Sequence, residues 1–286
     1  MINVYFCRQL SVYMRHFFYL LMLMLITSGC SQYQKALKSE DLAFKSKLAE
    51  ELYNAKKYKK SIRLYEQIEP KYRGRPQGER ILYFYATNLY FLKDYITSGY
   101  QLERFTSAYP RSEKVEEVAL MGAKSYYHLS PKYSLDQTDT QTALDKLQNF
   151  INSYPKSERL DEANALYQEL AGKLERKAFE VAKQYNKIYD YQAALKSLDL
   201  FLTEYPGSSF REEALYYRVL ASFNYAENSI QIRQIDRYKD VLAAYNKLVD
   251  SFKESIYIGQ LKTMVNKSKA QIERLTLLAN NASNNP

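Results

Sequence analysis

The sequence predicts an all-α fold of about five helical hairpins followed by a C-terminal helix. Three observations lead to this prediction. The chain of 286 residues contains only 8 glycines and 7 prolines, and leucine, alanine, lysine and glutamate, which favour helices, are frequent. A stretch with helical spacing of apolar side chains recurs along the chain, as is typical of stacked repeats. Three of these stretches end in a Tyr-Pro pair, and proline cannot continue a helix.

The recurring stretches align on their last aromatic residue. Large and small residues then repeat at intervals of four and three. The aligned sets are Tyr72, Tyr109, Tyr154, Tyr205 and Phe252; Ile68, Phe105, Phe150, Phe201 and Leu248; Tyr65, Leu102, Leu147, Leu198 and Tyr245; Ser61, Ser98, Ala143, Ala194 and Val241; and Tyr58, Tyr95, Thr140, Tyr191 and Tyr238. This spacing places them on one stripe of a helix, so we expect them to be core. The pattern resembles the second helix of a tetratricopeptide repeat (TPR), which implies a TPR-like superhelix.

The residues around each stripe complete the predicted hairpins. Ala49, Ala86 and Ala182 occupy the small position of the first helices, where two helices approach closely. The serine two residues after each Tyr-Pro pair is expected to be the N-cap of the next helix. These serines are Ser112, Ser157 and Ser208.

The repeat spacing divides the chain. We expect a signal peptide at 1–29, a lipidated tether at 30–41, TPR-like repeats 1–3 at 42–173, repeats 4–5 with the terminal helix at 174–280, and a disordered tail at 281–286. Repeats longer than the usual 34 residues carry extensions. These are the loop at 130–140, one helix of about eight turns within 157–189, and the stretch 226–236.

The start of the chain contains a short apolar run before a cysteine, FFYLLMLMLITSGC at 17–30. A run of about ten residues is too short to span a membrane and suits an export signal. The pattern resembles the lipobox of bacterial lipoproteins, which implies that Cys30 is lipidated, although Thr27 replaces the usual leucine. A plain thiol after an ordinary cleavage site and a buried core helix are the alternatives. Translation can start at Met1 or Met14.

The residues after the cysteine bear on location. Ser31 follows Cys30, and the first residues beyond it contain no acidic cluster. In lipoproteins of this kind, these features imply delivery to the outer membrane and a place on its periplasmic face. The formal net charge is +9, but the basic residues are interleaved with acidic residues along the whole chain. We therefore interpret them as a solvated helical surface and expect no nucleic-acid partner.

The lipobox, the short tether, the five TPR-like repeats and the C-terminal helix together resemble the BamD family of the β-barrel assembly machine, most closely its Bacteroidetes branch. Local matches include KYRGR at 71–75, SLDQT at 134–138 and AENSI at 226–230. The resemblance implies a scaffold whose C-terminal repeats hold the POTRA domains of the barrel-inserting protein. It also implies that the N-terminal repeats meet unfolded β-barrel precursors.

The candidate contact residues follow from this resemblance. Four arginines of repeats 4 and 5 lie outside the stripe and are expected to be exposed; they are Arg211, Arg218, Arg233 and Arg237. Arginine is enriched at interface hot spots. The second candidate is the loop containing Ser134, Leu135, Asp136 and Gln137.

The sequence indicates no enzyme, no cofactor and no metal site, because it contains no phosphate loop and no cluster of metal ligands. His128 is expected to act as a cation at a helix C-terminus. Acid pairs that follow the junctions, such as Glu116-Glu117, Asp161-Glu162 and Glu212-Glu213, are expected to complement helix dipoles. Two alternatives stay open: a glycan-capturing TPR lipoprotein of the SusD kind, and a periplasmic TPR coordinator protein.

Overall fold

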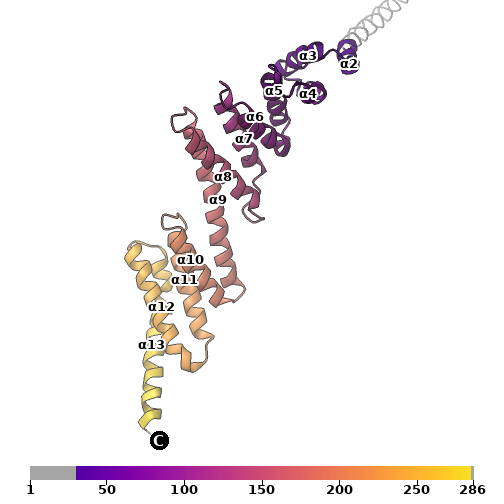
Figure 1. Cartoon of the computed structure of the whole chain (residues 1–286). Coiled ribbons are helices and arrows are strands. Elements are labelled where there is room, and N and C mark those ends of the chain that lie inside the picture. Colours follow the sequence, from indigo (N-terminus) through magenta and orange to yellow (C-terminus); the bar gives the residue numbers. More distant parts are fainter. Residues whose placement is uncertain (1–29, 285–286) are drawn as a thin grey trace, which may run out of the picture. The chain divides into compact units, whose positions relative to one another are not determined.

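The computed structural model describes residues 30–284, so the predicted signal peptide lies outside the described residues. Within that range the chain is entirely helical (Figure 1). The helices are α2 (Cys30–Lys38), α3 (Leu42–Asn54), α4 (Tyr58–Tyr72), α5 (Gly78–Phe91), α6 (Tyr95–Ala108), α7 (Val115–Leu129), α8 (Thr138–Ser153), α9 (Leu160–Lys187), α10 (Tyr191–Glu204), α11 (Arg211–Glu227), α12 (Gln231–Ser251) and α13 (Tyr257–Asn284). The predicted all-α fold of helical hairpins is confirmed.

The described helices form two compact units. The first unit extends to Ser130 and includes Asp139–Leu166; the second contains Pro131–Thr138 and the chain from Tyr167 onwards. In the first unit, α3, α4, α5 and α6 each pack on the helix that follows, and in the second unit α10, α11 and α12 do the same. The division falls inside α9, the helix that also contains the predicted boundary at residue 173.

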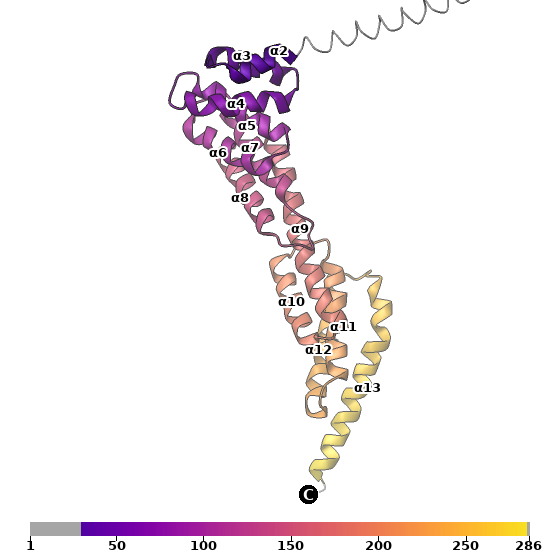
Figure 2. The same cartoon turned by 90° about the vertical axis from the view of Figure 1, so that its right-hand side faces the viewer.

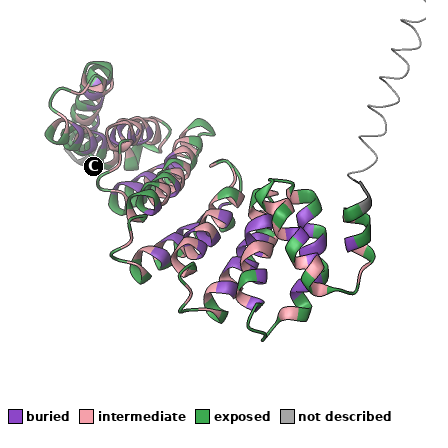
Figure 3. Cartoon of the chain, turned by 90° about the horizontal axis from the view of Figure 1, so that it is seen from above, coloured by how far each residue is buried: buried purple, intermediate pink, exposed green. Residues whose placement is uncertain are grey.

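The predicted stripe forms the core of the hairpins. Of its members, Tyr65, Leu102, Leu147, Leu198 and Leu248 are fully buried. The second helices α4, α6, α8, α10 and α12 end at the aligned aromatic residue or just before it. Buried residues face neighbouring helices in Figure 3. The predicted long helix is also present, because α9 has 28 residues, or about eight turns.

Small residues let the two helices of a hairpin approach closely. Ala49 and Ala86 are fully buried on α3 and α5. The Ser61 hydroxyl of α4 donates to the Ala49 carbonyl oxygen at 2.8 Å, and the Ser98 hydroxyl of α6 donates to the Ala86 carbonyl at 3.3 Å. A larger side chain at either position would separate the helices, because protein interiors are close-packed.

The junction serines do not occupy the predicted N-cap position. The helix that follows Ser112 begins only at Val115, because a short turn intervenes. Each serine instead accepts from the backbone N–H two residues on, at 2.9–3.0 Å, and its hydroxyl donates to a glutamate of an earlier helix. The three pairs are Ser112–Glu79, Ser157–Glu116 and Ser208–Glu175. These bonds tie each junction back to the preceding repeat.

Helices reach both ends of the described chain. The predicted tether contains α2, whose Ala36 is fully buried against α3 and α4. The predicted tail is helical as far as Asn284, because α13 continues to that residue. Leu261 and Leu275 of α13 join the core of α11 and α12, and α13 lies alongside α12 in Figure 2. Packing of Ala36 and of Leu261 and Leu275 thus holds α2 and α13 against their neighbouring helices.

A buried ion pair joins the first two hairpins. Glu69 of α4 is only 5% exposed, and its carboxylate accepts from Arg104 of α6. Arg73, the residue that follows the end of α4, also donates to Glu69 at 3.0 and 3.1 Å. Because a buried carboxylate needs compensating charge, Arg104 is expected to contribute to the stability of this unit.

Arg104→Met is expected to lower the free energy of unfolding by about 2–3 kcal/mol, because it leaves the buried Glu69 with one exposed partner. The matched control is Arg80→Met, which removes the exposed pair between Arg80 and Glu50 and should cost less than about 1 kcal/mol. Urea denaturation measures both variants. Equal losses in the two would contradict the special role of the buried pair.

Candidate functional site

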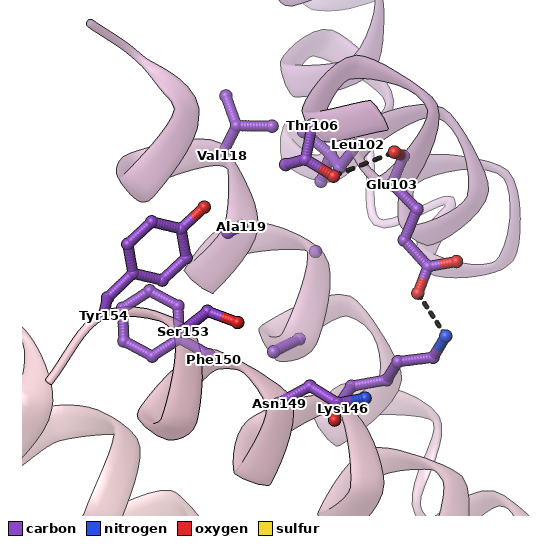
Figure 4. A pocket seen from close by; sticks show the side chains of 12 residues that line it. Leu102, Glu103, Thr106, Val118, Ala119, Lys146, Asn149, Phe150, Ser153 and Tyr154 are labelled. Carbon is purple, nitrogen blue, oxygen red and sulfur yellow. Dashed lines mark hydrogen bonds and ion pairs between the residues drawn. The ribbon is translucent and has the colours of Figure 1, made fainter. Parts of the chain in front are cut away.

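The first unit contains a cavity between α6, α7 and α8 (Figure 4). Its volume is about 210 Å³, below the 300–1,000 Å³ typical of small-molecule sites. Leu102, Val118 and Phe150 line its apolar side. The size suits one side chain of an extended polypeptide better than a cofactor or a free metabolite.

One wall of the cavity is charged. Lys146 of α8 forms an ion pair with Glu103 of α6 at 2.6 Å, and its ammonium lies 5.2 Å from the centre of the Tyr126 ring. Burial, with a contribution from Glu103, raises the pKa of Tyr126 to about 12, so this phenol is protonated at neutral pH. Tyr154 and Phe150 face the pair across the cavity in Figure 4. The site therefore combines an apolar and aromatic wall with a polar rim.

The predicted loop is held in one conformation within the second unit. The Gln137 amide is buried and donates to the carbonyl oxygens of Lys132, Leu135 and Asp136 at 2.8–3.2 Å. The Asp136 carboxylate accepts from the Thr138 N–H at 2.9 Å, and hydrogen bonds from the Thr138 side chain and backbone lower the pKa of Asp136.

Two contacts join this loop to α9. Lys177 donates to the Leu135 carbonyl, and the Arg176 guanidinium lies 4.3 Å from the centre of the Tyr133 ring. The Leu135 side chain is nevertheless exposed. The backbone at Ser134 is part of the same turn. The loop is thus tied to α9 and displays one apolar side chain.

Two of the four predicted contact arginines are engaged inside the second unit. Arg218 forms a bidentate pair with Asp199 at 2.6 and 3.2 Å, and Arg211 donates to the Leu202 carbonyl at 2.9 Å. Both side chains lie against α10 and are only partly exposed. The expectation that they are freely exposed is wrong, because α11 packs on α10 and brings acceptors within reach.

The other two arginines lie on α12 and differ from each other. Arg237 is partly buried: its guanidinium stacks at 3.7 Å over the Tyr225 ring and donates to the Tyr225 hydroxyl at 2.8 Å and to Ser229. It therefore fastens the α11–α12 connection, and the expectation that it is exposed is wrong. Arg233 is exposed as expected, next to two apolar residues that are also exposed, Ile230 at 71% and Ile232 at 83%.

Sequence reasoning missed both apolar features, the cavity and the Ile230–Ile232 pair. The sequence could have predicted that the two isoleucines are exposed, because neither lies on the buried stripe of α12. It could not have predicted the cavity, since the cavity depends on the placement of three helices. Its lining residues were assigned to the core or the surface individually.

No catalytic constellation is visible among the described residues. They contain no group of three or more His, Cys, Asp or Glu side chains that could hold a metal ion. The His128 ring stacks on Tyr95 with centroids 4.4 Å apart, and burial, with Lys124 and Lys93, lowers its pKa. His128 lies in the last turn of α7, as predicted, but these surroundings disfavour its charged form and do not support the predicted role as a helix-capping cation.

The first-turn acids are where the sequence predicts them, in α7, α9 and α11. Cys30 is the first residue of α2, and its lipidation stays a prediction. Within the described range, no helix combines the length and the apolar character needed to cross a bilayer.

Comparison with known proteins identifies the family. A family model named YfiO and described as an outer membrane lipoprotein matches residues 43–196, which include α3 to α9 and the start of α10. No curated protein matches the chain. The match agrees with the predicted resemblance to BamD-like lipoproteins, while the Bacteroidetes branch stays a prediction. Because the matched stretch covers more than half of the sequence, the chain belongs to the YfiO family of outer membrane lipoproteins.

Proposed function

We propose that this lipoprotein is a non-enzymatic scaffold of the β-barrel assembly machine, anchored by lipid at Cys30 on the periplasmic face of the outer membrane. The observation that carries the proposal is the family match over the helical hairpins at residues 43–196. A series of hairpins presents an extended surface to other proteins, which suits a scaffold.

The partner of the second unit is the barrel-inserting protein, held through its POTRA domains. Ile230, Ile232 and Arg233 form an exposed cluster at the start of α12, which we name the α12 entry cluster. Grouped exposed apolar side chains are typical of interaction surfaces, and arginine is enriched at interface hot spots. Arg233 adds a donor for bidentate pairing with a carboxylate. Arg211, Arg218 and Arg237 support this surface indirectly, through their contacts within the unit.

Unfolded β-barrel precursors are the proposed clients of the first unit. The α6–α8 cavity has room for one side chain, an aromatic wall at Phe150 and Tyr154, and a charged rim at Glu103 and Lys146. An extended precursor segment has alternating apolar side chains and a polar backbone. The aromatic wall suits one apolar side chain, and the charged rim suits the polar backbone. The loop at 134–137, with its exposed Leu135, is a further candidate contact.

The double variant Ile232→Ser with Arg233→Glu is expected to reduce co-purification of the barrel-inserting protein from native outer membranes at least about tenfold, as for a hot-spot residue. Neither side chain contributes to the core, so circular dichroism should be unchanged. The matched control is Ile256→Ser with Lys262→Glu, which changes an exposed isoleucine and an exposed lysine of the same unit. Undiminished co-purification of the first variant would place the interface elsewhere.

A further inference from the structure

The turn between α3 and α4 carries an unusual concentration of positive charge. Lys56, Lys57, Lys59 and Lys60 lie within five consecutive residues, and we name this group the lysine turn. All four are exposed, and the stretch from Tyr53 to Tyr65 contains no acidic residue. Within the described part of the chain, none of the four forms an ion pair. Their charge is therefore uncompensated.

The fold itself does not call for lysines here. The equivalent turns before α6 and α10 have aspartate at the N-cap, and Asp94 and Asp190 accept from backbone N–H groups at 3.2 and 3.1 Å. At the same place before α4, Lys57 makes no side-chain cap. Positive charge near a helix N-terminus is unfavourable. The lysine turn thus reduces local stability. Its charge is therefore better explained by a binding partner than by the stability of the hairpin.

The lysine turn lies beside the helix that begins at the anchor residue. The Lys60 ammonium is 5.5 Å from the centre of the Tyr33 ring on α2. Tyr33 is three residues after Cys30, which corresponds to about 4.5 Å along a helix. Because α2 packs on α3 and α4, this arrangement is part of the folded unit. A membrane that holds the lipid of Cys30 therefore lies close to these lysines.

The surface is hollowed at the same place. Tyr58 and Leu92, together with the lysine stems, line an open depression of about 520 Å³. Lysine can lay its methylene stem along an apolar surface while its ammonium stays in water. The four ammonium groups therefore complement the phosphate of a lipid headgroup, and the apolar and aromatic floor complements its glycerol backbone.

We propose that the lysine turn binds the anionic phospholipid headgroups of the membrane to which the chain is anchored. A lipid chain and a basic patch together hold a protein to a membrane more firmly than either alone. The contact also sets the orientation of the first hairpin at the bilayer. The proposal extends the proposed anchoring at Cys30, and its test uses protein without the lipid, so that the two can fail separately.

The test is sedimentation of the mature-length Cys30→Ser protein with vesicles. We expect binding to vesicles of phosphatidylethanolamine and phosphatidylglycerol but not to vesicles of phosphatidylcholine alone. Changing all four lysines to glutamine should weaken binding at least about 100-fold, because each basic residue near an anionic surface contributes roughly fivefold. Raising the salt to about 1 M, where the Debye length falls to roughly 3 Å, should release the unchanged protein.

Two further variants serve as controls. Lys239, Lys247, Lys262 and Lys269 are exposed residues of α12 and α13; changing these four to glutamine alters the net charge equally and should leave vesicle binding unchanged. The four-arginine variant of the lysine turn keeps the charge and should bind vesicles like the unchanged protein, even if the glutamine variant folds poorly.

Three results would overturn the proposal. The first is a failure of either vesicle comparison, which means equal binding to both kinds of vesicle or equal losses in the glutamine variant and its control. The second is displacement by inorganic phosphate at constant ionic strength, which would indicate a site for free phosphate. The third is a glutamine variant that binds vesicles normally but loses a co-purified protein, which would make an acidic protein the partner of the lysine turn.

Discussion

Cys30→Ala is expected to release the protein from outer-membrane fractions and to leave unprocessed precursor in the cell. The resemblance of Ser28-Gly29-Cys30 to a lipobox implies that the cysteine carries acyl chains. A single chain binds a membrane only marginally, whereas several together anchor it stably. Without them, the chain depends on surface charge and on its partners. Membrane fractionation and the intact mass of the protein measure the two effects.

The other cysteine of the chain supplies the control for this experiment. Cys7 lies before the apolar run, so Cys7→Ala should leave processing and membrane retention unchanged. Normal processing and full retention of the Cys30 variant would disprove lipidation at this residue. Membrane retention with a mass that lacks acyl chains would instead assign anchoring to the lysine turn or to a protein partner.

The hairpins could be predicted from sequence because their determinants are local and repeated. The 3-4 spacing of Leu198, Phe201 and Tyr205 defines one face of a helix, and Pro206 ends it. The helical spacing recurs in each repeat, and a proline follows the last aromatic residue in three of them, so an error in one unit does not affect the others. Burial of the stripe then follows, since only one face of each helix is apolar.

Side-chain partners across helices could not be predicted in this way. Arg237 and Arg233 are equivalent in sequence, one helical turn apart, yet only Arg237 reaches the Tyr225 ring. Gln137 is an ordinary loop residue in the sequence, but in the structure its amide holds three carbonyl groups. Such contacts depend on how a connection folds back on its own helices, and no spacing rule describes that. Candidate interface residues chosen from charge alone are therefore the least reliable part of a sequence-based prediction.

Phe201→Ala is expected to lower the stability of the second unit by about 3–5 kcal/mol, the usual cost of removing a buried phenylalanine. Phe201 is 1% exposed and lies 5.6 Å, centroid to centroid, from Phe179 of α9. It belongs to the cluster that also includes Leu198 and Leu215. The substitution therefore leaves a cavity that α9, α10 and α11 share, and none of these helices can close it alone.

The neighbouring residue gives a matched control for this prediction. Leu200 is 56% exposed on the outer face of α10, so Leu200→Ala should change the free energy of unfolding by less than about 0.5 kcal/mol. Thermal unfolding of both variants measures the difference, and the Phe201 variant should lose roughly 10 °C in Tm. Because units of a repeat array stabilise their neighbours, the loss should also increase hydrogen exchange in α11 and α12. Similar losses in the two variants would mean that α10 turns a different face to the core.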